Sequence, residues 1–110
     1  VRTSTFNTVK NMEAIRAAAG LTFYDDLVTV IFMDDGVWTA TELKPEVISA
    51  PEGVQMKTNI EMLLKFKGRL IVDEDSAKAR GITNIIKEAE FKSFNEIVEI
   101  ITESDVIIPW

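Results

Sequence analysis

The chain of 110 residues contains no cysteine and no histidine. The absence of cysteine excludes disulfide bonds, thiolate catalysis and zinc sites with cysteine ligands. The absence of histidine removes the usual general base near neutral pH and the commonest metal ligand in proteins. Carboxylates, hydroxyls, lysine, arginine and the backbone are left for chemistry. The composition therefore favours a binding or partner protein over an enzyme.

Long apolar runs and basic stretches are lacking as well. No run approaches the roughly 18 apolar residues that a membrane span needs, and no basic leader with an apolar centre is present. With 12 basic and 18 acidic residues, the formal net charge is −6. The sequence contains no basic stripe that would bind the phosphate backbone of nucleic acid. The sequence thus predicts a cytoplasmic protein that binds neither membranes nor nucleic acid.

The apolar content is that of an ordinary globular protein. Hydrophobic residues make up 46% of the chain, and a chain of this length forms one domain with a single core. We therefore expect residues 1–110 to be a single domain. The opening Val1-Arg2-Thr3 has the character of the end of a strand, so we also expect that this domain lacks the start of its first strand.

Three apolar runs are predicted to be strands. Each is too continuously apolar to have a solvent face, which is typical of parallel strands covered by helices on both sides. All three should therefore be central strands of one parallel sheet. The runs are Leu27–Met33, Arg69–Val72 and Asp105–Ile108, and Ile85–Phe91 is expected to supply a further short strand.

Helical patterns lie between these runs. Strands that alternate with helices indicate right-handed βαβ units, and we predict a three-layer α/β sandwich around a mainly parallel sheet of four or five strands. Lys44–Gly53, with two prolines, is expected to be a loop. The predicted helices are Asn7–Ala19 with Gly20 just past its end, a short one at Val37–Leu43, Gln55–Phe66, one turn at Ser76–Arg80, and one that begins with the capping box Ser93–Glu96.

Ligands of such sheets gather at the carboxyl ends of the strands. This rule selects four segments for a functional site: Thr3–Thr8, Asp34–Trp38, Asp73–Ser76 and Pro109–Trp110. The hydroxyl-rich Thr3–Thr8 lacks the glycines of a phosphate-binding loop. The two acidic segments, Asp34–Trp38 and Asp73–Ser76, are therefore the stronger candidates for a functional site.

Three motifs, in matching order and spacing, resemble the DsrE/DsrF/DsrH family of small sulfur-relay proteins, which includes the TusB, TusC and TusD subunits. They are YDDLVTVIFMDDGVW at 24–38, DSAKARGI at 75–82 and SDVIIPW at 104–110. The resemblance covers nearly the whole chain. It implies a flavodoxin-like sandwich that is usually oligomeric, either with itself or with related sulfur-relay subunits.

The resemblance also implies a task, and this chain departs from it at one residue. In the sulfur-carrier members a cysteine just after the strand before the second motif holds a persulfide. The matching position here is Asp73, and a carboxylate cannot hold sulfane sulfur. The resemblance therefore implies no catalytic residue, no cofactor and a non-catalytic binding or assembly role in cytoplasmic sulfur transfer, as in members that are structural subunits.

A second interpretation rests on the acidic residues of the two segments. If their carboxylates approach one another, they can bind a hard cation such as Mg²⁺ or handle phosphate, and the chain would be a small enzyme. The plainer alternative is that these side chains end strands and cap helices. The residues of this site are Asp34, Asp35, Gly36, Asp73, Glu74, Asp75, Ser76 and Arg80.

Gly36 and Arg80 each allow two interpretations. Gly36 serves close packing or a positive φ angle. Arg80 either faces an anion near Asp73 or caps its own helix and pairs with a carboxylate.

Large apolar side chains near loops and helix ends predict an oligomer. Tryptophan is enriched at the centres of protein interfaces, although each tryptophan here can equally cover an open end of the core. We expect the contacts in Val37–Leu43 and Gln55–Phe66. The residues proposed for the interface are Trp38, Met56 and Trp110.

Overall fold

The computed structural model describes residues 1–2, 10–22, 27–41 and 52–110. The predicted segment Thr3–Thr8 and most of Lys44–Gly53 lie outside the described residues. In chain order the elements are the helix α1 (Lys10–Leu21), the strand β1 (Thr29–Phe32), the 3₁₀ helix η2 (Asp34–Ala40), the helix α2 (Glu52–Lys65), the strand β2 (Arg69–Asp73), the short helix α3 (Glu74–Ala79), the strand β3 (Ala89–Lys92) and the helix α4 (Phe94–Glu103).

The strands form one parallel sheet in the order β1-β2-β3. Phe32 of β1 lies opposite Val72 of β2, and Val72 lies opposite Phe91 of β3. Helices connect each strand to the next, as βαβ units require. The α/β class, with a parallel sheet flanked by helices, is thus confirmed. The described residues contribute three strands where four or five were predicted.

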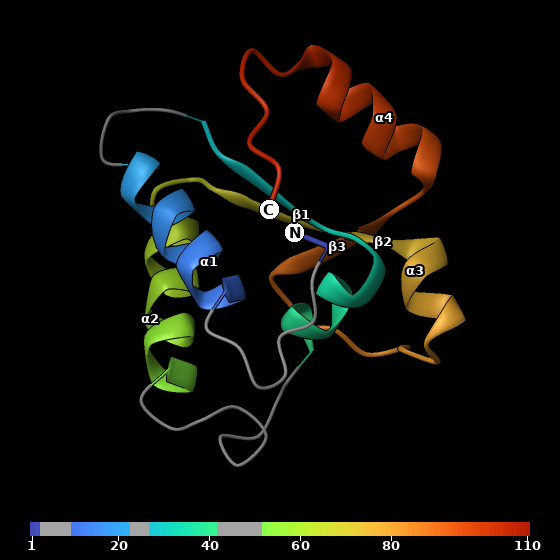
Figure 1. Ribbon diagram of the computed structural model, residues 1–110, viewed down its shortest axis with the longest axis horizontal. Helices are drawn as coiled ribbons and strands as arrows, with labels where there is room; N and C mark the ends of the chain where they lie inside the picture. The colour runs from blue at the N-terminus through green and yellow to red at the C-terminus, as the bar shows by residue number, and fades with distance from the viewer. Residues whose placement is uncertain (3–9, 23–26, 42–51) are drawn as a thin grey trace.

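The main core lies between the sheet and the helices α1 and α2, which run side by side (Figure 1). Phe32 and Val72 point into it from the strands, Ile15 from α1 and Leu63 from α2, and all four are buried. Ile71 lies between two core residues of β2 and therefore faces the other side of the sheet, where it is also buried. The helix α4 lies away from α1 and α2 (Figure 1) and buries Ile97.

The prediction that all three apolar runs are central strands holds for one run only. Arg69–Val72 lies in β2, the middle strand. Leu27–Met33 contains β1, which is the edge of the described sheet and leaves Leu27 87% exposed. A strand is central only if a second neighbour binds its outer backbone groups, and apolar content cannot supply that neighbour.

Asp105–Ile108 is not a strand, which corrects the prediction for the third run. Val106, Ile107 and Ile108 are exposed by 76%, 57% and 61%. Extended backbone becomes a strand only when another strand binds its N–H and C=O groups. The segment ends beside the amino terminus (Figure 1), where Arg2 N–H donates to the Trp110 carbonyl over 3.1 Å.

Helix ends follow the sequence signals in part. The helix α1 continues through Gly20 to Leu21, so Gly20 is not the residue past the end that was predicted. The helix α3 begins two residues earlier than predicted and is followed by Gly81, whose φ of +68° favours glycine. The capping box is confirmed, because Ser93 Oγ accepts a hydrogen bond from the backbone N–H of Glu96.

The capping box generates a pH-dependent prediction for α4. The hydrogen bond from the Ser93 side chain lowers the pKa of Glu96 below its ordinary value of 4.5. Because the folded state has the lower pKa, this contribution to stability is present above pH 4.5 and is lost as the pH falls through the folded pKa. Ser93→Ala should cost about 1 kcal/mol at pH 7 and flatten the pH dependence below 4.5.

Urea unfolding of the wild type and of Ser93→Ala at several pH values between 3 and 7, about the range in which carboxylates titrate, measures both effects. Ser104→Ala is the matched control at the other end of α4, where the Ser104 hydroxyl donates to the Ile100 carbonyl. An equal pH dependence in wild type and Ser93→Ala would contradict the assignment.

Candidate functional site

The polar site lies where β1 and β2 end. Both strands run in the same direction, so their carboxyl ends and the segments that follow meet at one edge of the sheet. The backbone N–H of Asp34, just after β1, donates to Ser76 Oγ of α3 over 3.0 Å. The structure thus brings the two acidic segments together, as the sequence predicts for parallel strands.

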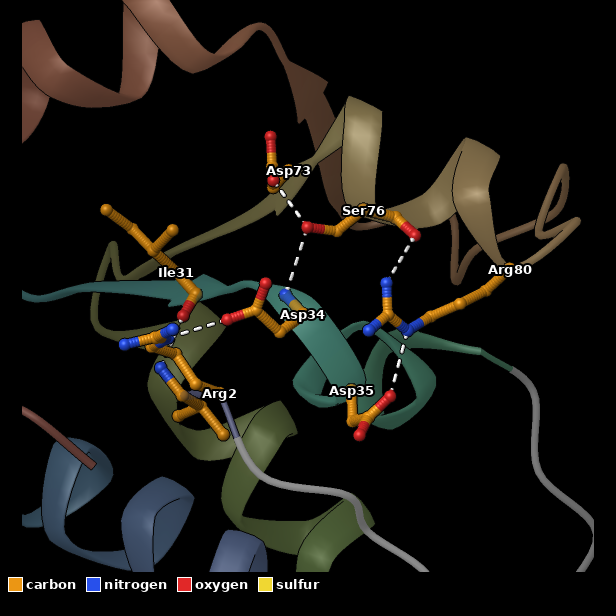
Figure 2. Close-up of polar contacts among 8 residues, drawn as sticks. Arg2, Ile31, Asp34, Asp35, Asp73, Ser76 and Arg80 are labelled. Atoms are coloured by element: carbon orange, nitrogen blue, oxygen red, sulfur yellow. Dashed lines mark hydrogen bonds and ion pairs between the residues drawn. The ribbon is translucent and has the colours of Figure 1, made fainter.

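Asp73 is the only carboxylate of the site that is buried, with 5% of its surface exposed. The Ser76 hydroxyl donates to Asp73 Oδ2 over 2.5 Å. The other oxygen, Oδ1, is buried without a hydrogen-bond partner among the described residues, and Figure 2 shows it directed away from Ser76. Asp73 is the N-cap residue of α3, but its side chain does not cap the helix. The prediction that the side chain of Asp75 or Ser76 caps this helix is therefore wrong, since the helix begins earlier and its N-cap residue makes no side-chain cap hydrogen bond.

Asp34 and Asp35 are adjacent in sequence, but their carboxylates point apart (Figure 2). Arg2 Nε lies 2.6 Å from Asp34 Oδ2, and Arg80 Nε lies 2.9 Å from Asp35 Oδ1. Arg80 also donates to the Ser76 carbonyl over 3.1 Å. Arg80 thus binds its own helix and a carboxylate, which is the second of the two predicted roles.

The remaining acidic side chains lie at the surface of α3. Glu74 forms an ion pair with Lys78 over 3.1 Å, and Asp75 is exposed. Among the residues that the structure describes, no group of three or more carboxylates is placed to hold a metal ion. The geometry therefore brings together Asp73, Ser76 and the backbone of Asp34, while every carboxylate of the site except that of Asp73 turns toward a basic partner or solvent.

Gly36 is required by the close approach of the first residue of the chain. A Cβ atom at this position would lie 2.0 Å from the Val1 carbonyl oxygen, which any side chain would displace. The same carbonyl accepts a hydrogen bond from Met33 N–H over 2.9 Å. Of the two predicted reasons for this glycine, close packing is thus confirmed.

Arg2 is the site residue that sequence reasoning missed. Its ion pair with Asp34 spans 32 positions of the chain. A usable signal was present, because Val1-Arg2-Thr3 had the character of a strand end. The carboxyl end of a parallel strand lies at the same edge as those of its neighbours, so the rule also applied to Arg2.

The residues proposed for an interface lie in different settings. Trp38 is half-buried and packs against the core from η2. Met56 is in α2, and its side chain lies outside the described residues. Trp110 is half-buried at the end of the chain, beside Arg2. Their role in an interface stays a prediction.

Fold and site together define a small parallel α/β domain with a buried carboxylate and a bridging hydroxyl at the carboxyl edge of its sheet. The model of the DsrE/DsrF-like family matches residues 1–110, and the chain belongs to this family. No curated protein matches the chain. Among solved structures, the crystal structure of the YchN protein from E. coli is similar, with a TM-score of 0.78, 17% identity, and coverage of 96% of this chain and 90% of that one. This similarity shows the fold.

The described helices also bear on the membrane prediction. None of them is both long and apolar enough to cross a bilayer.

The buried hydrogen bond of Asp73 yields a stability prediction. Ser76→Ala removes the only donor to this carboxylate among the described residues, and the free energy of unfolding should fall by about 1–3 kcal/mol. Asp35→Asn is the matched control, because it breaks an exposed ion pair that contributes less than about 1 kcal/mol. Urea unfolding measures both variants. Equal losses in the two would show that the buried bond has no special weight.

Proposed function

We propose that this chain is a non-catalytic binding or assembly protein associated with cytoplasmic sulfur transfer. Membership of the DsrE/DsrF-like family supports a role related to sulfur relay in general. The observation that carries the finer proposal is that the chain contains no cysteine; by the resemblance, Asp73 stands at the position of the carrier cysteine. A carboxylate forms no persulfide, so the sulfur itself must travel on another protein.

The setting of Asp73 supports a binding role. Its Oδ2 is held by Ser76, and Ser76 in turn holds the backbone after β1. The side chain therefore connects two segments of this edge and is not a free group poised for transfer. A partner that recognises the edge would meet a surface whose exposed acids, Asp34 and Asp35, are already paired with arginines.

The alternative function, a metal- or phosphate-handling enzyme, stays a prediction. Such an enzyme needs carboxylates that converge on one ion. The divergence of Asp34 and Asp35 (Figure 2) does not favour it.

The first functional prediction concerns sulfur itself. The wild-type protein, incubated with a sulfane-sulfur donor, should show no stable adduct by mass spectrometry, because it has no thiol. A species heavier by about 32 Da, one sulfur atom, that a reductant removes would contradict the proposal.

A cysteine at the carrier position is a more searching test. If the edge keeps the geometry of the sulfur carriers, Asp73→Cys should acquire one reductant-sensitive sulfur from the same donor. Ser104→Cys is the matched control, at the exposed carboxyl end of α4, where the helix dipole disfavours a thiolate. Equal reactivity of the two thiols, at equal folded content by circular dichroism, would remove the support that Asp73 lends to the proposal.

The proposal includes assembly with like or related subunits. In the described part of the chain, Phe94 and Val98 of α4 are exposed by 54% and 43%, and Phe91 of β3 by 38%. A lasting interface buries more than about 1,000 Å² in total, and a symmetric assembly would place such a patch against its copy.

Light scattering coupled to size exclusion at micromolar concentration tests whether the chain assembles with copies of itself. A multiple of the 12.3 kDa chain mass is expected. A monomer would contradict the homo-oligomer and leave assembly with related sulfur-relay subunits, which co-elution with such subunits would test directly.

A further inference from the structure

The strand β3 ends at the same edge of the sheet as β1 and β2, and its last residue is Lys92. The strands are parallel, so the residues at their carboxyl ends lie close together. The register places Lys92 directly opposite Asp73, and neighbouring strands lie only about 4.8 Å apart. A lysine therefore stands beside the position that the resemblance assigns to the carrier cysteine.

Lys92 and Asp73 also project from the same face of the sheet. Val72 points into the core, and side chains alternate along a strand, so Asp73 faces the other side of the sheet. Residues in register on neighbouring strands share a face, which places Lys92 on that side too. The contacts of Lys92 agree, because its ammonium lies 3.7 Å from the carboxylate of Glu90, which alternation puts on the same face.

Asp73 lacks a positively charged partner. It is buried, Ser76 donates the hydrogen bond to its Oδ2, and its Oδ1 has no partner among the described residues. The arginines at this edge are paired with Asp34 and Asp35 instead. An ionised carboxylate is costly to bury unless a countercharge or further donors stabilise it. Asp73 is thus the group at this edge that would gain most from a nearby cation.

Lys92 is held only weakly by its present partners. Its Nζ lies 3.5 Å from Glu96 Oε2 and 3.7 Å from Glu90 Oε2, distances longer than an ordinary N–H···O hydrogen bond. Both glutamates are about half exposed, and exposed pairs contribute little. The Lys92 side chain is itself 28% exposed, against 70% for Lys78 of α3. Lys92 can therefore exchange these partners for Asp73 at small cost.

We propose that Lys92 is the countercharge of position 73 and belongs to the binding site at the carboxyl edge. Its ammonium turns from Glu90 and Glu96 to donate to Asp73 Oδ1, and it stabilises an anionic group at position 73 in general. The inference rests on the proposed function only in that this function makes position 73 the centre of the site. It adds the end of β3 to a site built from the ends of β1 and β2.

The first test is a double-mutant cycle on the full chain. Urea midpoints are measured for the wild type, Asp73→Asn, Lys92→Met and the double variant. Lys92→Met should lower the midpoint, and this loss should shrink by more than about half once Asp73→Asn has removed the charge. The contacts of Lys92 with Glu90 and Glu96 are lost in both backgrounds and therefore cancel. Additive losses would overturn the proposal.

The matched control is a cycle of Asp73→Asn with Lys78→Met. Lys78 lies on the helix that follows Asp73, but its ammonium pairs with Glu74 over 3.1 Å at the surface. The losses in this cycle should add. Equal coupling in the two cycles would also overturn the proposal, because it would reflect only the general effect of removing charge from an acidic chain.

Thiol reactivity provides a readout that is independent of unfolding. In Asp73→Cys, alkylation by iodoacetamide at pH 7 should slow by more than about threefold when Lys92→Met is added, because a nearby cation favours the thiolate. Adding Lys78→Met instead should leave the rate nearly unchanged. An unchanged rate with Lys92→Met would overturn the proposal. Neither test requires Asp73→Cys to take up sulfur, so failure of this inference is distinguishable from failure of the proposed function.

Discussion

One hydroxyl group joins the two strand ends on which the site depends. Ser76 Oγ donates to the buried Asp73 carboxylate and accepts the backbone N–H of Asp34. Hydrogen bonds to ionised groups are stronger than neutral ones, and this one offsets part of the cost of burying a carboxylate. The same contacts hold η2 against α3, so the turn after β1 and the helix after β2 keep a common geometry.

Charge pairing decides the chemical character of this edge. Exposed ion pairs such as Arg2–Asp34 and Arg80–Asp35 contribute little to stability. Their effect is directional, because each arginine holds its carboxylate away from the other. Of the five acidic residues that could have formed a cation site, Asp34, Asp35 and Glu74 each pair with a basic side chain. Asp75 is exposed to solvent, and only Asp73 is buried. What remains at the centre is a hydrogen-bonded bridge that links Asp73, Ser76 and the backbone of Asp34.

Local signals in the sequence were reliable where the interacting residues lie within the same short segment. Ser93 and Glu96 satisfy each other's backbone and side-chain groups within one turn, so the start of α4 was predictable. Arg69–Val72 is short and apolar, and it became the middle strand. Gly20 failed as a stop signal because α1 continues through it to Leu21, and a glycine inside a helix carries only a modest cost.

Residue patterns alone were enough to predict the α/β class, the order of most elements and the meeting of the two acidic segments at one edge, and they show that no thiol is present. These follow from periodicity, chain direction and residue chemistry, which are local properties. Three features became known only from the folded chain: β1 is an edge of the described sheet, 105–108 is not a strand, and Arg2 and Arg80 hold the carboxylates of Asp34 and Asp35 apart. Strand pairing and ion pairing join residues tens of positions apart, and no short-range pattern encodes which distant neighbour fills a given place.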